Sequence, residues 1–384
     1  MAEELSLREK KSAGNQELPE QTADGFGGCH LSPETSLPGM GEFEMPPGAS
    51  LQAACAAAQQ YLADHKIEDA AVDAWYLLEY VTGTSRAAYL ADRDRKMSKE
   101  QQAAYVALVN RRGAHIPLQH LTGEQEFMGL PFLVNEHVLI PRQDTETLVE
   151  LALERLALVK RDEPAGEAQE VPSLRVLDLC TGSGCIAVSI AKLWEQRKKK
   201  HNIEAYASDI SKDALAVARE NARRLGADVH FLQGDLFTWT LMLAPYIMGQ
   251  TGKAGRECEN EINEKTSFRC CKEGRGSVAA LTFDMIVSNP PYIRTDVIAE
   301  LAEEVRSHEP RLALDGGEDG LEFYRRILLE SPAHLHRGGW LLLEIGYDQG
   351  GAVADLMRKN GFSHVQVAKD LPGQDRVVSG QWLD

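Results

Sequence analysis

The 384-residue sequence has no apolar run close to the ~18–20 residues that cross a bilayer, which excludes a membrane-spanning helix. Basic residues are in deficit, because 41 Lys and Arg stand against 58 Asp and Glu, a formal net charge of -17. Such a surface repels a phosphate backbone, so general nucleic-acid binding is disfavoured. The seven Cys are odd in number and scattered, which favours a reducing compartment over a disulfide framework.

The amino-terminal segment has neither the features of a targeting signal nor the apolar periodicity of a folded element. MAEELSLREKK has no apolar stretch behind its charges, and its acidic residues are unusual for a transit peptide, so we expect a cytoplasmic protein. Residues 1–48 carry nine acidic and three basic side chains and hardly any apolar periodicity. Because such a segment cannot bury enough apolar surface to offset its ordering entropy, we expect a disordered tail.

Helical spacing of apolar residues begins at Leu51, and Ser98 and Gln101 have the spacing of a capping box. These patterns predict a small helical domain over residues 50–122. In residues 123–141, apolar residues flank Asn135-Glu136-His137, which is typical of a β-hairpin turn. We therefore expect a β-hairpin linker there.

Residues 142–384 alternate apolar strands with helices, which predicts an α/β domain with a doubly wound, mostly parallel sheet. The last two strand-like runs, HVQVAKDL and RVVSGQWL, are joined by a short turn and should form an antiparallel pair. Residues from about 240 to 280 break the alternation, and we interpret them as an insertion. That stretch has neither CxxC pairs nor His at ligand spacing, so we expect no metal site.

A glycine-containing loop follows the first strand of this domain. The loop runs from Asp178 through Cys180, Thr181, Gly182, Ser183 and Gly184 and opens a helix. Free backbone N–H groups and missing side chains let a nucleotide-like ligand approach closely there, although a tight turn between strand and helix also favours glycine. The GxG spacing without a P-loop Lys points away from a dinucleotide or ATP and towards S-adenosylmethionine.

Acidic residues end the next two strands. Asp209, thirty-one residues after Asp178, ends the second strand, where a carboxylate can accept hydrogen bonds from ribose hydroxyls. Asp235 and Leu236 close the third strand and would lie by the adenine, with Asp235 accepting the exocyclic amine or ordering the loop, and Leu236 packing on the ring. Taken alone, Asp235 would also serve as a helix cap.

The segment Ser288-Asn289-Pro290-Pro291-Tyr292 follows the strand FDMIV. Two Pro residues would disrupt a central strand, so the segment must lie just beyond its carboxyl end, where open α/β sheets bind ligands. The Asn289 side-chain oxygen and the Pro290 carbonyl can accept the two N–H groups of a planar NH₂, with Tyr292 stacked on its face. This arrangement predicts transfer of a methyl group to an amino or amide nitrogen.

Asn-Pro-Pro-Tyr after the fourth strand resembles amino-methylating enzymes in general. Narrower similarity lies in the segments IPRQDTE at 140–146, Gly123 with EFMGL at 126–130, and EP at 309–310 with ALDGGEDG at 313–320. With these segments the sequence resembles the PrmC/HemK family, which methylates the glutamine of the Gly-Gly-Gln motif in translation release factors. The resemblance covers residues 50–384 apart from the insertion.

The resemblance implies a seven-stranded, Rossmann-like, S-adenosylmethionine-dependent methyltransferase domain with a small amino-terminal helical domain that contacts class I release factors. It implies that Thr181 to Gly184 hold the methionine part of the cofactor. The ribose would lie at Asp209 and the adenine at Asp235 and Leu236. The target glutamine would lie between Asn289, Pro290, Pro291 and Tyr292, with Phe127 lining its pocket. Arg142 and Glu146 match the family signature and should brace the linker.

Three features depart from the family pattern. Cys180 stands where the family usually has its first glycine, and Gln143 stands where it usually has proline. The 54 residues from Asp235 to Asn289 exceed the usual gap.

Two alternatives remain at this point. A nucleic-acid adenine methyltransferase would use the same turn on a flipped-out base, but it should carry a basic face. A non-catalytic scaffold that binds S-adenosylmethionine would not need an intact Asn289 and Tyr292. We expect the glutamine methyltransferase, with no direct nucleic-acid or membrane partner and as a monomer.

Overall fold

The structure is a computed structural model that describes residues 41–159, 173–197, 201–240 and 281–384. The expected insertion and residues 1–40 of the expected tail lie outside the described residues. None of the helices in these ranges is long and apolar enough to cross a membrane.

Five helices form the first part of the described chain: α1 (Leu51–Asp64), α2 (Ala70–Thr82), α3 (Arg86–Ala91), α4 (Lys99–Gly113) and α5 (Leu118–Thr122). The predicted capping box is confirmed, because the Ser98 hydroxyl accepts the Gln101 N–H and the Gln101 side chain accepts the Ser98 N–H. The apolar faces of these helices share one core, which includes Leu62, Leu78 and Tyr105. The helical part therefore has its own hydrophobic core.

The expected disordered tail is wrong for its last residues. Phe43 is 4% exposed, and its N–H donates to Asn110 Oδ1 at 2.7 Å. Its ring lies 5.3 Å from that of Tyr61 between α1 and α4. One aromatic side chain that fills a gap between two helices needs no apolar periodicity, which is why the pattern gave no sign of it.

The predicted β-hairpin is present, but its predicted turn is wrong. Strands β1 (Glu124–Phe127) and β2 (Leu130–Leu133) are antiparallel and joined by Met128 and Gly129, whose φ values of 53° and 72° suit a two-residue hairpin turn. The segment at Asn135 is a separate turn, in which Asn135 Oδ1 accepts the His137 N–H at 3.0 Å. The apolar residues on either side of that turn pack against a helix of the sheet domain rather than pair as strands.

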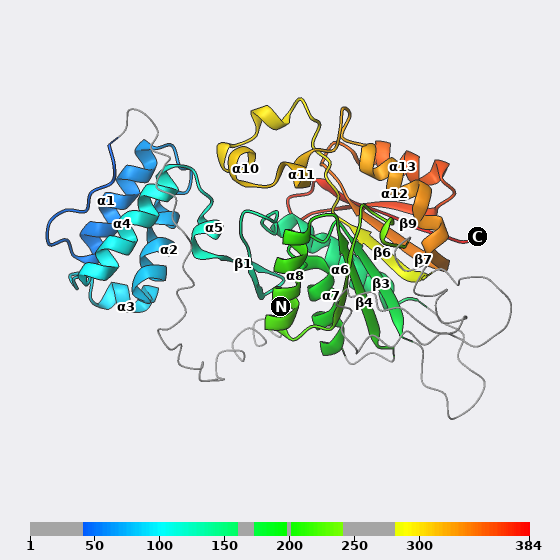
Figure 1. Ribbon diagram of the computed structural model, residues 1–384, viewed down its shortest axis with the longest axis horizontal. Coiled ribbons are helices and arrows are strands. Elements are labelled where there is room, and N and C mark those ends of the chain that lie inside the picture. The colour runs from blue at the N-terminus through cyan, green and yellow to red at the C-terminus, as the bar shows by residue number, and fades with distance from the viewer. Residues whose placement is uncertain (1–40, 160–172, 198–200, 241–280) are drawn as a thin grey trace, which may run out of the picture. The chain divides into compact units, whose positions relative to one another are not determined.

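The remaining strands form one seven-stranded sheet in the order β5-β4-β3-β6-β7-β9-β8 (Figure 1). They are β3 (Leu174–Leu179), β4 (Ile203–Asp209), β5 (Val229–Gln233), β6 (Phe283–Ser288), β7 (Leu335–Glu344), β8 (Ser363–Lys369) and β9 (Asp375–Gln381). The first five are parallel, and β9 is antiparallel to both of its neighbours, which confirms the mostly parallel sheet and the antiparallel closing pair.

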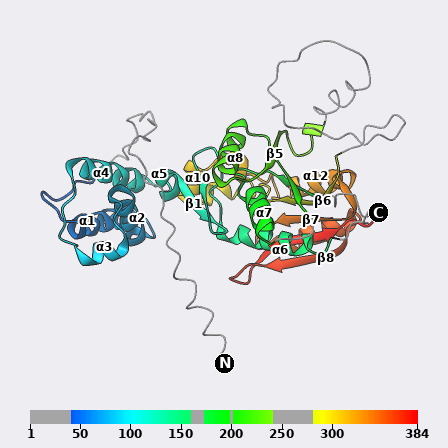
Figure 2. The same cartoon turned by 90° about the horizontal axis from the view of Figure 1, so that it is seen from below.

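Two hydrophobic clusters lie on opposite faces of the sheet. One cluster contains buried residues of α6 (Glu146–Leu156) and α7 (Cys185–Gln196), together with Ala222 of α8 (Lys212–Leu225). The other contains α12 (Glu322–Glu330) and α13 (Gly350–Lys359). Figure 2 shows α6 and α12 on opposite sides of β6 and β7.

Short helical segments complete the chain: η1 (Gln143–Thr145), η2 (Ile298–Glu300), α10 (Glu303–His308), α11 (Arg311–Leu314) and η3 (Ser331–His334). Strands β3 to β7 run in the same direction, so their carboxyl ends meet at one edge of the sheet. That edge carries the predicted site residues.

Candidate active site

A cavity of about 310 Å³ lies at the carboxyl edge of the sheet. Its wall contains the glycine loop from Cys180 to Ser183, the segment 209–211 after β4, the segment 234–236 after β5, and Asn289 with Pro291 after β6. Residues of the linker before α6, including Arg142 and Thr145, complete it. The structure therefore brings most of the predicted residues together around one space.

Asp178, near the end of β3, hydrogen bonds to the glycine loop that follows it. It is fully buried, and its Oδ2 accepts the Thr181 hydroxyl at 2.6 Å and the Ala187 N–H at 3.3 Å. Its Oδ1 has no hydrogen-bond partner among the described residues. Burial raises the pKa of Asp178 to about 7. A buried carboxylate with one free oxygen is suited to a cationic or hydrogen-bond-donating group.

The glycine loop requires left-handed backbone at three positions. Gly182 and Gly184 have φ values of 54° and 81°, and a Cβ on Gly184 would lie 3.0 Å from Ala218 Cβ on α8. Cys180 also has a positive φ, 59°, although it carries a side chain. The departure from the family pattern therefore places a strained residue in the wall of the cavity.

Asp209 holds the loop from the neighbouring strand. Its Oδ2 accepts the Gly182 N–H and its Oδ1 accepts the Ser211 N–H, both at 2.9 Å. Burial raises the pKa of Asp209, and these backbone donors oppose the rise. The Ile210 N–H also donates to this carboxylate, which keeps lone-pair capacity for a further donor in the cavity.

Asp235 and Leu236 lie on the wall of the same cavity. Leu236 is 4% exposed with φ 51°, so the turn after β5 directs it inward. The Asp235 carboxylate forms an ion pair of 2.7 Å with Arg326 of α12, which also lies on the wall. This ion pair could not be predicted from the sequence, because Arg326 follows Asp235 by 91 positions.

The turn after β6 is anchored to its neighbours. The Ser288 hydroxyl donates to the Leu179 carbonyl at 2.8 Å, and Asn289 Nδ2 donates to Thr145 Oγ1 at 3.4 Å. Asn289 and Pro291 contribute to the cavity wall, whereas the buried Pro290 and the half-buried Tyr292 do not. Tyr292 packs against the cluster of α12 and α13, and burial raises its pKa.

Phe127 is not brought to the cavity. It is 1% exposed, its ring lies 6.0 Å from that of Phe132, and it belongs to the cluster that includes α6 and α7. Its place in the hydrophobic core agrees with its position on the inward face of a short hairpin.

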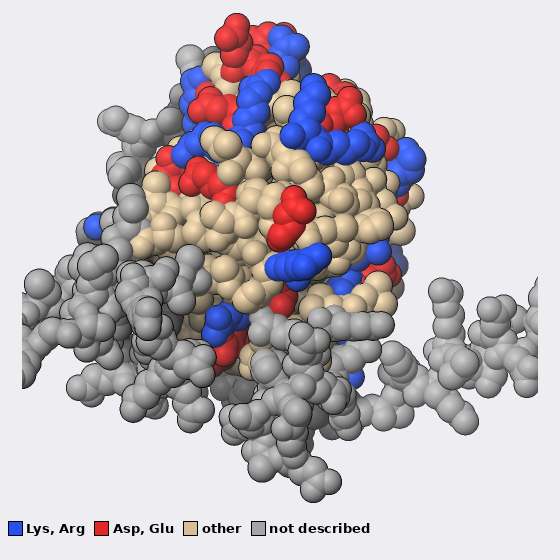
Figure 3. All heavy atoms as spheres, turned by 90° about the vertical axis from the view of Figure 1, so that its right-hand side faces the viewer, with Lys and Arg blue, Asp and Glu red and all other residues tan. Residues whose placement is uncertain are grey.

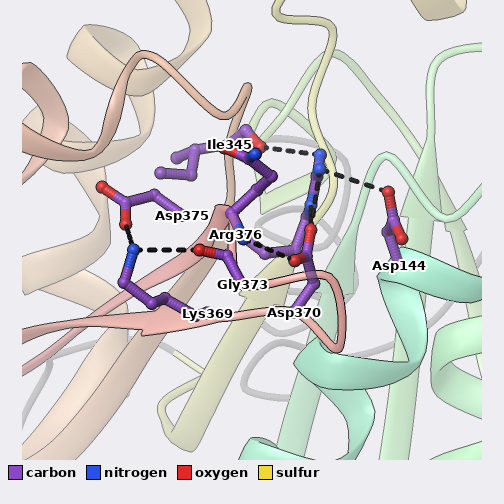
Figure 4. Close-up of polar contacts among 8 residues, drawn as sticks. Asp144, Ile345, Lys369, Asp370, Gly373, Asp375 and Arg376 are labelled. Atoms are coloured by element: carbon purple, nitrogen blue, oxygen red, sulfur yellow. Dashed lines mark hydrogen bonds and ion pairs between the residues drawn. The ribbon is translucent and has the colours of Figure 1, made fainter.

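The segment 142–146 contacts three other parts of the chain: the residue after α10, the hairpin turn and β9. Arg142 forms an ion pair of 2.5 Å with Glu309, and Glu146 Oε1 accepts the Met128 N–H of the hairpin turn at 2.6 Å. Asp144 lies 3.1 Å from the Arg376 guanidinium of β9 (Figure 4). These contacts brace the linker against the sheet domain.

Two residues near Asn289 were missed in the sequence. Thr145 and Glu344 are both 2% exposed, and Thr145 and Asn289 interact with the Glu344 carboxyl and lower its pKa. Glu344 Oε2 has no hydrogen-bond partner among the described residues. One available signal was that Glu344 ends the apolar run LLLEIG, just as Asp178 and Asp209 end theirs.

Sequence comparisons define the family. A profile described as the PrmC N-terminal domain matches residues 53–123, and one described as a methyltransferase domain matches residues 170–245. The release factor glutamine methyltransferase of Geobacter sulfurreducens is 37% identical over 84% of this chain and 93% of its own length. The chain belongs to the release factor glutamine methyltransferase family.

Other members of the release factor glutamine methyltransferase family are similar over comparable lengths. The Moorella thermoacetica protein is 39% identical over 85% of this chain and 96% of its own, and the Bacillus subtilis protein is 36% identical over 84% and 94%. A solved release factor-specific protein-(glutamine-N5) methyltransferase from Alicyclobacillus acidocaldarius is 28% identical, with a TM-score of 0.30 over 66% of this chain and all of that one. The predicted family and fold class are confirmed.

Proposed function

We propose that this chain transfers a methyl group from S-adenosylmethionine to the side-chain amide nitrogen of the glutamine in the Gly-Gly-Gln motif of class I release factors. The observation that carries the proposal is the position of Asn289. Its amide lies on the wall of the cavity that also contains the glycine loop and Asp209. An acceptor for a substrate N–H and the elements of a nucleoside site thus share one space.

The residues present fit the proposed cofactor. Asp178 has a buried oxygen without a partner among the described residues, which suits the donors of a methionine ammonium held in the glycine loop. Asp209 retains lone pairs that suit ribose hydroxyls, and Leu236 offers an apolar surface that suits the adenine ring. S-adenosylmethionine would supply an electrophilic methyl group on a sulfonium.

An amide nitrogen is a weak nucleophile because its lone pair is delocalised into the carbonyl. Positioning must therefore supply much of the rate, and well-oriented reactants gain roughly 7–11 kcal/mol. In this proposal Asn289 Oδ1, on the cavity wall, accepts one N–H group of the glutamine. The carbonyl of the buried Pro290, which lies outside that wall, accepts the other. The partial negative charges of these two oxygens stabilise the positive charge that develops on nitrogen, so the proton can leave after methyl transfer.

A nucleic-acid adenine methyltransferase is the main rival activity, and it would need a face that attracts phosphates. The net charge of -17 disfavours one. On the face in Figure 3, Lys and Arg lie among Asp and Glu with uncharged residues between them, so this face has no continuous basic surface. The charge distribution supports a protein substrate.

The proposal is tested with a methyl-labelled cofactor and three acceptors: an intact class I release factor, the same factor with Gln of its Gly-Gly-Gln motif changed to Ala, and double-stranded DNA. We expect label on the unchanged factor alone. Label on the Ala variant would move the target to another residue, and label on DNA would support the rival activity. A protein that binds the cofactor but labels no acceptor would be a scaffold.

A further inference from the structure

Glu344 lies beside the Asn289 turn because of the register of two central strands. Ser288 of β6 pairs with Leu343 of β7, so the next residues, Asn289 and Glu344, are neighbours at the carboxyl edge. Glu344 is 2% exposed. A carboxyl group in this position is costly to bury, and it needs partners.

Thr145 and Asn289 are those partners. The Thr145 hydroxyl and the Asn289 amide interact with the Glu344 carboxyl and lower its pKa, while Glu344 Oε2 has no hydrogen-bond partner among the described residues. Asn289 Nδ2 also lies 3.4 Å from Thr145 Oγ1 and donates to it. Thr145, Asn289 and Glu344 come from the linker, the β6 turn and β7, and they form one buried polar group next to the cavity.

The chemistry of this group fixes the orientation of the Asn289 amide. An ionised carboxylate only accepts hydrogen bonds, and a hydroxyl that donates to the carboxylate can offer only its lone pairs to Asn289. The Asn289 NH₂ must therefore face Glu344 and Thr145, and a reversed amide would set Oδ1 against a carboxylate. The preferred orientation leaves Oδ1 free for a substrate donor.

We propose that Glu344 and Thr145 are positioning residues that orient the Asn289 amide, so that the site selects a substrate NH₂ group. This assignment rests on the proposed function, in which Asn289 Oδ1 accepts the glutamine N–H. Glu344 and Thr145 act through Asn289 rather than on the substrate. Removal of their acceptor character should lower kcat more than it weakens binding of the cofactor.

The neighbouring charges hold this group in place. Asp144, one residue before Thr145, pairs with Arg376 at 3.1 Å, and Arg376 also binds Asp370 at 3.0 Å (Figure 4). Arg376 further donates to the Ile345 carbonyl, next to Glu344. The linker and the end of β7 are thus tied to the same guanidinium.

The test uses the full-length chain and an intact class I release factor at pH 8, where most of the Glu344 carboxyl is ionised because its pKa is about 7. The kcat and the KM for each substrate are measured separately. Glu344→Gln keeps the shape but introduces an NH₂ that can donate to Asn289 Oδ1 and hold the amide in the reversed orientation. Thr145→Val keeps the shape but removes the hydroxyl. Each should lower kcat about tenfold or more, with the KM for S-adenosylmethionine within about twofold of wild type. Thr145→Ser should restore most of the kcat lost in Thr145→Val.

A matched control is Asp284→Asn. Asp284 is a buried carboxylate at the opposite end of β6, where it accepts the Arg175 N–H at 2.7 Å. Its substitution should lower stability and leave kcat of the folded enzyme within about twofold, because the two ends of the strand act independently.

Non-additivity supplies the second readout. Because both residues act on one amide, the Glu344→Gln/Thr145→Val double variant should lose little more kcat than the worse single variant. If the wild type is active and both single variants keep a kcat within about twofold of it, the positioning role is overturned but the proposed function is not. Additive losses, or a kcat that Thr145→Ser does not restore, would also overturn it. A wild type that methylates no release factor would overturn the proposed function, and this assignment with it.

Discussion

The Arg142 guanidinium lies 2.5 Å from the Glu309 carboxylate, whose side chain is 1% exposed. This pair joins the linker before α6 to the segment after α10. Glu309 Oε2 has no hydrogen-bond partner among the described residues, so Arg142 is the main charge that compensates this carboxylate.

Arg142→Met should destabilise the protein by about 1–2 kcal/mol at pH 8, because it leaves a buried carboxylate without its counter-charge. The loss is smaller than for a fully buried pair, because the Arg142 side chain is 42% exposed. The double variant Arg142→Met/Glu309→Gln should recover most of the lost free energy of unfolding, measured by urea unfolding. An Arg142→Met protein as stable as wild type would show that the pair is only a surface contact.

Cys180 allows a test of backbone strain with a matched pair of variants. Cys180→Ala and Cys180→Gly both remove the sulfur, but only Gly tolerates the observed φ of 59° without penalty. Cys180→Gly should therefore be about 1 kcal/mol more stable than Cys180→Ala in thermal or urea unfolding. Equal stabilities, or a more stable Ala variant, would mean that the loop adopts another conformation in solution.

Asp209→Ala removes the acceptor of the Gly182 and Ser211 N–H groups together with the proposed ribose contact. The affinity for S-adenosylmethionine should fall by about tenfold or more, because a charge-assisted hydrogen bond and the shape of the loop are both lost. Isothermal titration calorimetry measures this effect directly. Unchanged affinity would remove Asp209 from the proposed cofactor site.

Glu344 predicts a dependence of stability on pH. Burial raises its pKa from 4.5 to about 7 against the hydrogen bonds of Thr145 and Asn289 and the charge of Arg376. The folded state thus holds a proton that the unfolded chain releases, so stability falls as the pH rises from about 4.5 to 7. The charged or titratable groups around Glu344 are Asp144, Cys185, Tyr292, Tyr324 and Arg376.

Glu344→Gln mimics the protonated acid at every pH. It should be more stable than wild type at pH 8, by about 1–3 kcal/mol, and close to wild type at pH 5. Urea unfolding at the two pH values tests this. A variant that is less stable than wild type at pH 8 would mean that the carboxylate is well compensated when ionised.

Much of the site could be predicted because parallel strands place their carboxyl ends at one edge. Asp178, Asp209 and Asn289 each follow an apolar run, so their proximity follows from the sheet alone. The ion pair between Arg326 and Asp235 could not be predicted, since that contact depends on how α12 packs against the sheet. It also could not distinguish the hairpin turn at Gly129 from the turn at Asn135, because both segments carry turn-forming residues.

Apolar residues at every third position from Val72 to Val81 predict a helix, and α2 spans this stretch, but the spacing does not reveal which of its members are buried. Val72 is 48% exposed, while Trp75 is 9% exposed. A strict period of three drifts around a helix of 3.6 residues per turn, so members of such a set leave the buried face. Glu344 was missed for a different reason, because a single carboxylate at a strand end does not reveal its partner on the next strand.

The most direct test of the account is fragment mass spectrometry of an intact class I release factor after incubation with S-adenosylmethionine and either the wild-type enzyme or Asn289→Ala. We predict one added CH₂ on the side chain of the Gly-Gly-Gln glutamine with wild type. With the variant, the rate should be reduced about 100-fold or more. A methyl group on another residue, no methyl group with wild type, or an equal rate with Asn289→Ala would contradict it.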